Sequence, residues 1–155
     1  MFQTWSKFRA LTLREKALLT AAILSLPIVR VALRYLGFRR VSGFLARIPP
    51  SLTPGLTGQP DEMDLARAIS TAALVRIAAD RGLCSANCLE QSMALWWLLR
   101  VQNIESEIVI GVRKHPRFEA HAWVELQSIV LNDREQVKTD FTPFHEPIVR
   151  NIPIR

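Results

Sequence analysis

Cysteine is scarce in this sequence, and a targeting signal is missing. The 155 residues contain two cysteines, Cys84 and Cys88. The chain does not open with a basic segment, an apolar run and a small-residue cleavage site, so no secretory signal is predicted. We therefore expect a reducing, cytoplasmic setting and no structural disulfide, because disulfides persist mainly in oxidising compartments.

The sequence also lacks a dense cluster of basic residues, although its formal net charge is +6. Proteins that bind single-stranded nucleic acid combine basic grooves with stacking aromatic residues. Here the arginines are scattered and no aromatic platform is interleaved with them: Arg30, Arg34, Arg39, Arg40 and Arg47. The pattern predicts no nucleic-acid partner, whereas an acidic or polar peptide would suit the charge.

A long uninterrupted apolar run is missing too. The most apolar stretch, Ala17 to Val29, has 13 residues and contains Pro27. A membrane-spanning helix needs about 20 apolar residues. The sequence therefore favours a buried helix, with peripheral membrane contact as the less favoured alternative.

What is present indicates one globular domain over residues 1–155. Apolar residues make up 49% of the chain and charged residues 22%, which is typical of a folded soluble protein. A segment rich in proline and glycine, from Ile48 to Pro60, predicts a loop or subdomain boundary. We expect a helical N-terminal extension over residues 1–60 and a catalytic core over residues 61–155.

The N-terminal part has the marks of two helices. Thr12 and Glu15 have the spacing of a capping box, which predicts a helix from there to about Leu26, where Pro27 interrupts or kinks it. A second, amphipathic helix is expected to follow, with four large residues facing inward. These are Val31, Leu33, Leu36 and Phe44.

The remaining elements predict helices first and strands second. A third helix is expected over Asp61 to Asp80 and a fourth after Asn87 or Ser85, either of which could cap it. Under both choices Cys88 lies in the first helical turn. Strand patterns then follow, and the order predicts an α+β fold with an antiparallel meander. The expected strands are Ile108–Val112, Ala120–Leu126 and Ile129–Leu131.

Cys88 is a candidate nucleophile. A helix start lowers the pKa of a thiol through its unpaired N–H groups and the helix macrodipole. The competing interpretation is a buried structural cysteine, since free cysteine is among the most buried residue types. Taken alone, the position does not decide between the two.

His121 and Asp133 are the candidate base and orienting acid. If Leu126 to Ser128 form a three-residue hairpin loop, His121 lies directly opposite Asp133, with Cβ atoms about 5 Å apart. A two-residue turn would break this parity unless a bulge restored it. Each residue alone is more often structural, but the three residues in the order Cys, His, Asp follow the logic of nucleophilic catalysis.

The same residues carry a resemblance to a known family. The segments concerned are Cys88-Leu89, Leu98-Leu99-Arg100, Ile110 to Lys114, Phe118 to Glu125, Val130 to Asp133, Lys7 to Leu11, Arg30 and Leu33-Arg34. On these the chain resembles the leader peptidases of lasso-peptide biosynthesis, in the bacterial transglutaminase-like superfamily. Ser128 stands where relatives often carry a turn glycine.

The resemblance implies a papain-like core in which the nucleophile begins a helix that packs on an antiparallel sheet. It implies a cysteine peptidase that removes the leader segment from a ribosomally made precursor peptide, with Cys88, His121 and Asp133 as catalytic residues. It also implies a separate leader-recognition protein and an ATP-using lasso cyclase as partners. Neither a metal nor another cofactor is expected in this reaction.

Three alternatives remain open at this point. One is a transglutaminase-like acyl transferase or amidase that shares the thioester step. Another is a metal-binding module that uses Cys84, Cys88, His115 and His121, although their spacing lies outside the common zinc patterns. The third is a non-catalytic adaptor with the same fold.

Overall fold

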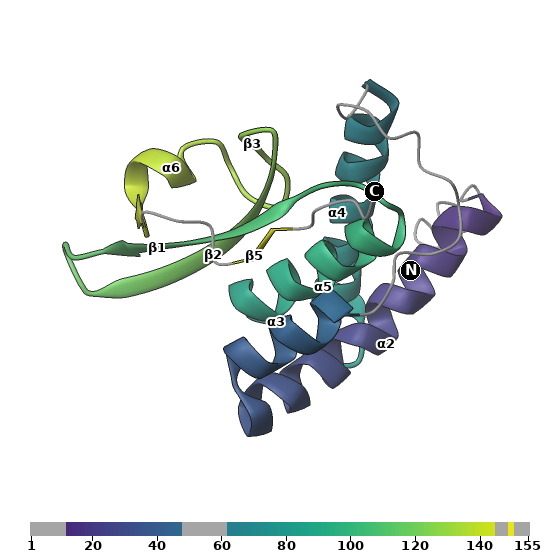
Figure 1. The fold of residues 1–155 in the computed structure, drawn as a ribbon, viewed down its shortest axis with the longest axis horizontal. Coiled ribbons are helices and arrows are strands. Elements are labelled where there is room, and N and C mark those ends of the chain that lie inside the picture. The colour runs from purple at the N-terminus through teal and green to yellow at the C-terminus, as the bar shows by residue number, and fades with distance from the viewer. Residues whose placement is uncertain (1–11, 48–61, 145–148, 151–155) are drawn as a thin grey trace.

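The structure, a computed structural model, describes residues 12–47, 62–144 and 149–150. Four long helices pack together below a curled antiparallel sheet, and the short helix α6 lies on the opposite side of the sheet (Figure 1). This arrangement confirms the predicted α+β fold. The loop expected from Ile48 to Pro60 lies outside the described residues.

The elements follow one another in the predicted order of helices and then strands. The helical layer consists of α2 (Leu13–Leu36), α3 (Phe38–Arg47), α4 (Glu62–Arg81) and α5 (Cys88–Val101). The second half consists of β1 (Glu107–Arg113), β2 (Glu119–Leu126), β3 (Ile129–Val130), α6 (Val137–Asp140), β4 (Thr142–Pro143) and β5 (Val149–Arg150). The sequence patterns did not predict α6, β4 or β5, each of which has two to four residues.

The capping box at the start of α2 is confirmed. The Glu15 amide donates to Thr12 Oγ1 at 3.2 Å, and the Thr12 amide donates to Glu15 Oε2 at 2.8 Å. The hydrogen bonds that Thr12 donates to the Glu15 carboxylate, from its amide and from its hydroxyl, lower the pKa of that carboxyl. The prediction that the helix stops near Leu26 is wrong, because α2 continues through Pro27 to Leu36. Leu26 and Val29, on either side of the proline, are both buried, and this packing outweighs one lost backbone hydrogen bond.

The predicted inward face of the second helix is also wrong. Val31, Leu36 and Phe44 are more than half exposed, and only Leu33 packs against the core. α2 has 24 residues, more than the 13-residue apolar run indicated, and by length and composition alone it could cross a membrane. Its buried face instead packs against α4 and α5.

The sheet separates two hydrophobic clusters. Alternate residues of β2, among them Ala122 and Val124, face the large core formed with the helices, where Trp96 of α5 is fully buried. Trp123, between them, packs on the other side with Phe141 and the residues around α6. The period-two alternation of β2 therefore places His121 on the side of the sheet that carries α6.

β1 is the centre of the sheet. The strand order is β3-β2-β1-β4, and β5 pairs with the other half of β1. The β1–β2 pairing places Gly111 opposite His121, and the β1–β4 pairing places Gly111 opposite Pro143. Three neighbours crowd the missing side chain: a Cβ at Gly111 would lie 2.9 Å from Trp123 Cη2, 3.0 Å from Phe141 Cβ and 3.1 Å from the carbonyl oxygen of Thr142.

We expect Gly111→Ala to lower the free energy of unfolding by about 1–3 kcal/mol, because the methyl group would overpack a site bounded by side chains and backbone. Gly43→Ala is the matched control: nothing lies within 4 Å of its Cβ position in α3, so alanine should stabilise the helix by about 0.5–1 kcal/mol. Urea unfolding measures both changes. Equal stability of Gly111→Ala and the unsubstituted protein would contradict the crowding.

Candidate active site

Cys88 is the first residue of α5, and the capping box before it fixes that position. The Glu90 amide donates to Asn87 Oδ1 at 2.9 Å, and the Asn87 amide donates to Glu90 Oε2 at 3.0 Å. Asn87 is thus the N-cap, which decides between the two caps considered from the sequence. Cys88 is half-buried and lies among the backbone N–H groups that have no partner within the helix.

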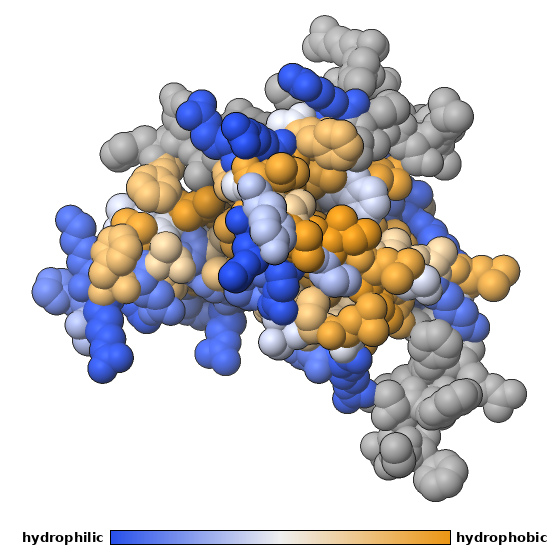
Figure 2. Space-filling view, turned by 90° about the horizontal axis from the view of Figure 1, so that it is seen from below, coloured by the Kyte–Doolittle hydropathy of each residue, from blue (hydrophilic) through white to orange (hydrophobic). Residues whose placement is uncertain are grey.

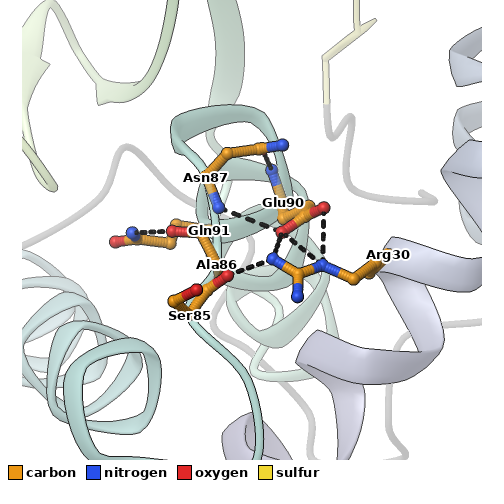
Figure 3. A network of polar contacts seen from close by, with 6 residues as sticks. All are labelled: Arg30, Ser85, Ala86, Asn87, Glu90 and Gln91. Carbon is orange, nitrogen blue, oxygen red and sulfur yellow. Dashed lines mark hydrogen bonds and ion pairs between the residues drawn. The ribbon is translucent and has the colours of Figure 1, made fainter.

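A second network ties this helix start to α2 (Figure 3). Arg30 Nε donates to Glu90 Oε1 at 3.1 Å, and Arg30 Nη2 donates to Glu90 Oε2 at 2.9 Å and to the carbonyl oxygen of Ser85. The hydrogen bonds to Glu90 are the main cause that raises the pKa of the Arg30 guanidinium. Glu90 therefore caps α5 and also anchors it to a helix 60 positions earlier in the chain.

We expect Arg30→Met to lower the melting temperature by several degrees, because the buried Glu90 carboxylate would lose its cation. Glu90 is only 6% exposed, so water would replace the guanidinium poorly. Arg34→Met is the control, since Arg34 is exposed on the same helix. Thermal unfolding followed by circular dichroism measures both variants, and equal melting temperatures would rule out a structural role for the Arg30–Glu90 pair.

His121 and Asp133 are in direct contact. His121 Nε2 and Asp133 Oδ2 lie 2.5 Å apart, and the imidazole stacks on Phe141 with ring centroids 5.1 Å apart. Because a carboxylate only accepts, Nε2 carries the proton in this contact. The other ring nitrogen, Nδ1, is then the proton acceptor when the imidazole is neutral.

The contact between His121 and Asp133 does not come from the hairpin register that was expected from the sequence. Gln127 and Ser128, both with positive φ (49° and 66°), make a two-residue turn that pairs Leu126 with Ile129. The predicted three-residue loop, and with it the directly opposed His121–Asp133 pair, is therefore wrong. The regular ladder ends at Val130, and the chain then leaves the strand so that Asp133 reaches the imidazole.

Asn132 holds the chain where it leaves the sheet. Its side-chain oxygen accepts from the Val124 amide at 2.8 Å, in the place of a strand carbonyl, and its amide nitrogen donates to Ser92 Oγ at 3.0 Å. Ser92 in turn donates to the carbonyl oxygen of Ala122 at 3.0 Å. Ser92 lies one helical turn after Cys88, so this network holds the first turns of α5 against the part of β2 that carries His121.

The structure brings His121 and Asp133 together on the side of the sheet that carries α6, whereas Cys88 begins α5, which packs on the other side of β2. Among the hydrogen bonds of residues 12–144 that the structure describes, none links Cys88 to His121. Hydrogen bonds between catalytic groups are often long before substrate binds and tighten in the complex. Cys84 is a half-buried thiol that packs against the helical core.

The metal-binding alternative finds no support in the arrangement of side chains. Within the described ranges, no group of three or more histidine, cysteine, aspartate or glutamate side chains is placed to hold a metal ion. His115 lies exposed beyond the end of β1, whereas Cys88 begins α5.

An open cleft of about 610 Å³ lies beside the His121–Asp133 pair. Arg113 and Glu119 form one wall, with Arg113 Nη2 2.5 Å from Glu119 Oε2 and the Arg113 guanidinium 4.9 Å from the centre of the Phe141 ring. Arg134, the residue after Asp133, also lines the cleft. A cleft with cations and anions on its walls can hold an extended polar peptide.

Sequence reasoning missed several residues that build this site: Arg30, Ser92, Asn132 and Phe141. Asn132 lies beside Asp133, and its ability to replace a backbone carbonyl was the available signal. Phe141 gave no signal, because its contact with His121 depends on α6 and β4 folding back across β1.

Comparison with known proteins gives two matches. The model of the family described as "Transglutaminase-like superfamily" matches residues 30–146. The Microcin J25-processing protein McjB of Escherichia coli is 42% identical over 52 residues, which is 34% of this chain and 24% of that protein. The match therefore spans about a quarter of the relative's length. No solved structure is significantly similar.

Proposed function

This chain belongs to the transglutaminase-like superfamily, and on that premise we propose that it is a cysteine peptidase of lasso-peptide maturation. Its substrate is a ribosomally made precursor, from which it removes the leader segment. The similarity to a microcin-processing protein supports peptide processing as the activity. Cys88 acts as nucleophile, His121 as base and Asp133 as the residue that orients the imidazole.

The first step is proton transfer from the thiol. Asp133 accepts a hydrogen bond from the Nε2–H of His121, which leaves the lone pair of Nδ1 free to take the proton of Cys88. The resulting thiolate lies at the N-terminus of α5, among backbone N–H groups without a partner in the helix. Stacking on Phe141 restricts rotation of the ring, so Nδ1 keeps one direction during the reaction.

The thiolate then attacks the last carbonyl carbon of the leader. The backbone N–H of Cys88, at the start of the helix, donates to the oxyanion that forms. As the carbon–nitrogen bond breaks, the imidazolium of His121 gives its proton to the departing amine of the core peptide. This leaves a thioester between Cys88 and the leader.

Water completes the cycle. His121 takes a proton from water, the hydroxide attacks the thioester, and the carbon–sulfur bond breaks to release the leader acid and the thiolate. The freed core amine is then available for joining to a side-chain carboxylate by a separate ATP-using cyclase. A separate recognition protein presents the leader, and the reaction takes place in the cytoplasm, where the thiol stays reduced.

One observation carries the proposal: the Asp133 carboxylate holds the imidazole of His121 by Nε2, on a strand that packs against the helix beginning at Cys88. The arrangement requires residues from a helix, a strand and the segment after a hairpin, and the networks of Glu90 and Asn132 hold each of these in place. A histidine that only packed in the sheet would not need a carboxylate on its outer nitrogen.

The test is incubation of the purified chain with the precursor peptide encoded beside it, with and without the recognition protein, followed by mass analysis. Peptidase activity gives two fragments whose masses sum to the precursor plus one water. An acyl transferase would give an amide-linked product lighter by one ammonia, whereas an amidase would exchange ammonia for water and leave the backbone uncut. An intact precursor under both conditions would reject the peptidase proposal.

A further inference from the structure

The helix α2 has two apolar faces, and only one of them is buried. Ala22, Leu26 and Val29 pack into the core, as expected for one face of a helix. On the opposite side a stripe of large apolar side chains is exposed at helical spacing: Leu24 54%, Ile28 68%, Val31 55% and Tyr35 76%. In a helix that meets only the core and water, these positions would be polar.

The next helix extends this exposed surface. In α3, Val41 and Ser42 are buried, while Phe44 is 65% exposed. Figure 2 views the side of the molecule on which α2 and α3 lie, and it shows hydrophobic side chains gathered there with hydrophilic ones around their margin. We call this surface the α2–α3 face; its apolar members are Leu24, Ile28, Val31, Tyr35, Leu36 and Phe44.

The charge of the whole chain is concentrated on the same two helices. Between positions 16 and 60 there are 6 basic residues and no acidic one, while the rest of the chain carries 14 basic and 14 acidic residues. The entire excess of +6 therefore belongs to this segment. Four of its arginines are exposed at the end of α2 and along α3: Arg34, Arg39, Arg40 and Arg47.

An apolar ridge flanked by arginines fits an anionic, fluid surface. From Leu24 to Tyr35 the stripe follows one straight helix for about 16 Å, at about 1.5 Å per residue. The shallow groove along it is lined by side chains of α2 alone, among them Pro27, Ile28 and Tyr35. A lipid interface accepts such a ridge without matching its shape, and its headgroups pair with arginines at the margin.

We propose that the α2–α3 face binds peripherally to an anionic lipid bilayer. The large side chains of the stripe enter the boundary between headgroups and acyl chains, while the arginines remain among the headgroups. The opposite face of α2 keeps its contacts with α4 and α5, so the helix lies on the membrane and does not cross it. The Arg30 contact with Glu90 also stays on the protein side.

The test is flotation of the full chain with two kinds of vesicle: equal parts of phosphatidylcholine and phosphatidylglycerol, or phosphatidylcholine alone. We expect binding to the mixed vesicles, at least about tenfold weaker binding to the neutral ones, and release by high salt, because salt screens the arginine–headgroup attraction. Failure to bind the mixed vesicles would overturn the proposal. Retention after a high-salt and alkaline wash would overturn peripheral binding.

Two pairs of variants separate the apolar and the charged contributions. Ile28→Glu with Val31→Glu should weaken binding to mixed vesicles at least about tenfold, whereas Met63→Glu, at an exposed position of α4, should not. Arg39→Gln with Arg40→Gln should also weaken it about tenfold. The matched control is Arg76→Gln with Arg81→Gln, which removes the same charge from exposed positions of α4.

Circular dichroism and light scattering keep the result interpretable. Every substituted position is solvent-exposed, so the variants should stay folded. These positions are Ile28, Val31, Arg39, Arg40, Met63, Arg76 and Arg81. Equal loss in the α4 controls would mean that net charge, and not this face, binds the vesicles. Self-association that the Ile28 and Val31 substitutions abolish, without vesicle binding, would assign the face to a second copy of the chain.

Discussion

Replacing Cys88 with alanine is expected to abolish leader removal, lowering the rate by about 10⁴-fold or more, because no other group on α5 can form the thioester. The substitution removes one sulfur at the first position of the helix and leaves the Asn87–Glu90 capping box intact. Folding and partner binding should therefore persist. Mass analysis of the precursor over time measures the loss.

Cys84→Ala is the matched control for this experiment. Cys84 is also half-buried and free, but it lies before the capping box and packs against the helical core. Its loss should leave the cleavage rate within about twofold, since it takes no part in the thioester chemistry. If Cys88→Ala cleaves as fast as the unsubstituted chain, the protein is an adaptor of this fold and not a peptidase.

Asp133→Asn is expected to lower kcat by about 10²–10⁴-fold with little change in KM. The new amide can donate to Nε2 of His121, which would move the imidazole proton to Nδ1. The nitrogen that should accept the thiol proton would then already be protonated. The side-chain oxygen can still accept from the Arg134 amide, a bond that is now 2.7 Å long, so the local chain should keep its position.

The control for Asp133 is Asp140→Asn, which removes a carboxylate from the same cleft. Asp140 belongs to α6, and the His121 contact described in the structure is made by Asp133 and not by Asp140. We expect Asp140→Asn to change kcat only a few-fold. Equal losses of kcat in the two variants would assign the effect to the charge of the cleft and not to the orientation of the imidazole.

Much of the local structure was predictable because its causes lie within one helical turn or one strand. The capping boxes of Thr12 with Glu15 and of Asn87 with Glu90 join residues three positions apart, so the sequence placed the first helix start and narrowed that of α5 to Asn87 or Ser85. The alternation in β2 likewise predicted a strand with two different faces. The change from helical to strand periodicity was enough to predict the α+β class.

The wrong predictions share a cause, because each concerned a feature that depends on contacts between distant segments. Pro27 stays within α2 because the residues around it are buried against other helices, which a propensity argument does not include. The hairpin register depends on whether Gln127 and Ser128 accept positive φ, and the site then depends on Asn132 reaching Ser92, 40 positions away. A correct expectation for the His121–Asp133 contact therefore rested on an incorrect pairing.

By itself, the sequence determined where the first helix begins, which segments form the main strands and which residue types are available for thiol chemistry. These features follow from hydrogen bonds and side-chain periodicity over a few residues. Only the tertiary structure decided that Asp133 leaves its strand to hold His121, and that one apolar face of α2 remains uncovered. Both depend on how separate elements pack, and packing is the sum of contacts that no short segment contains.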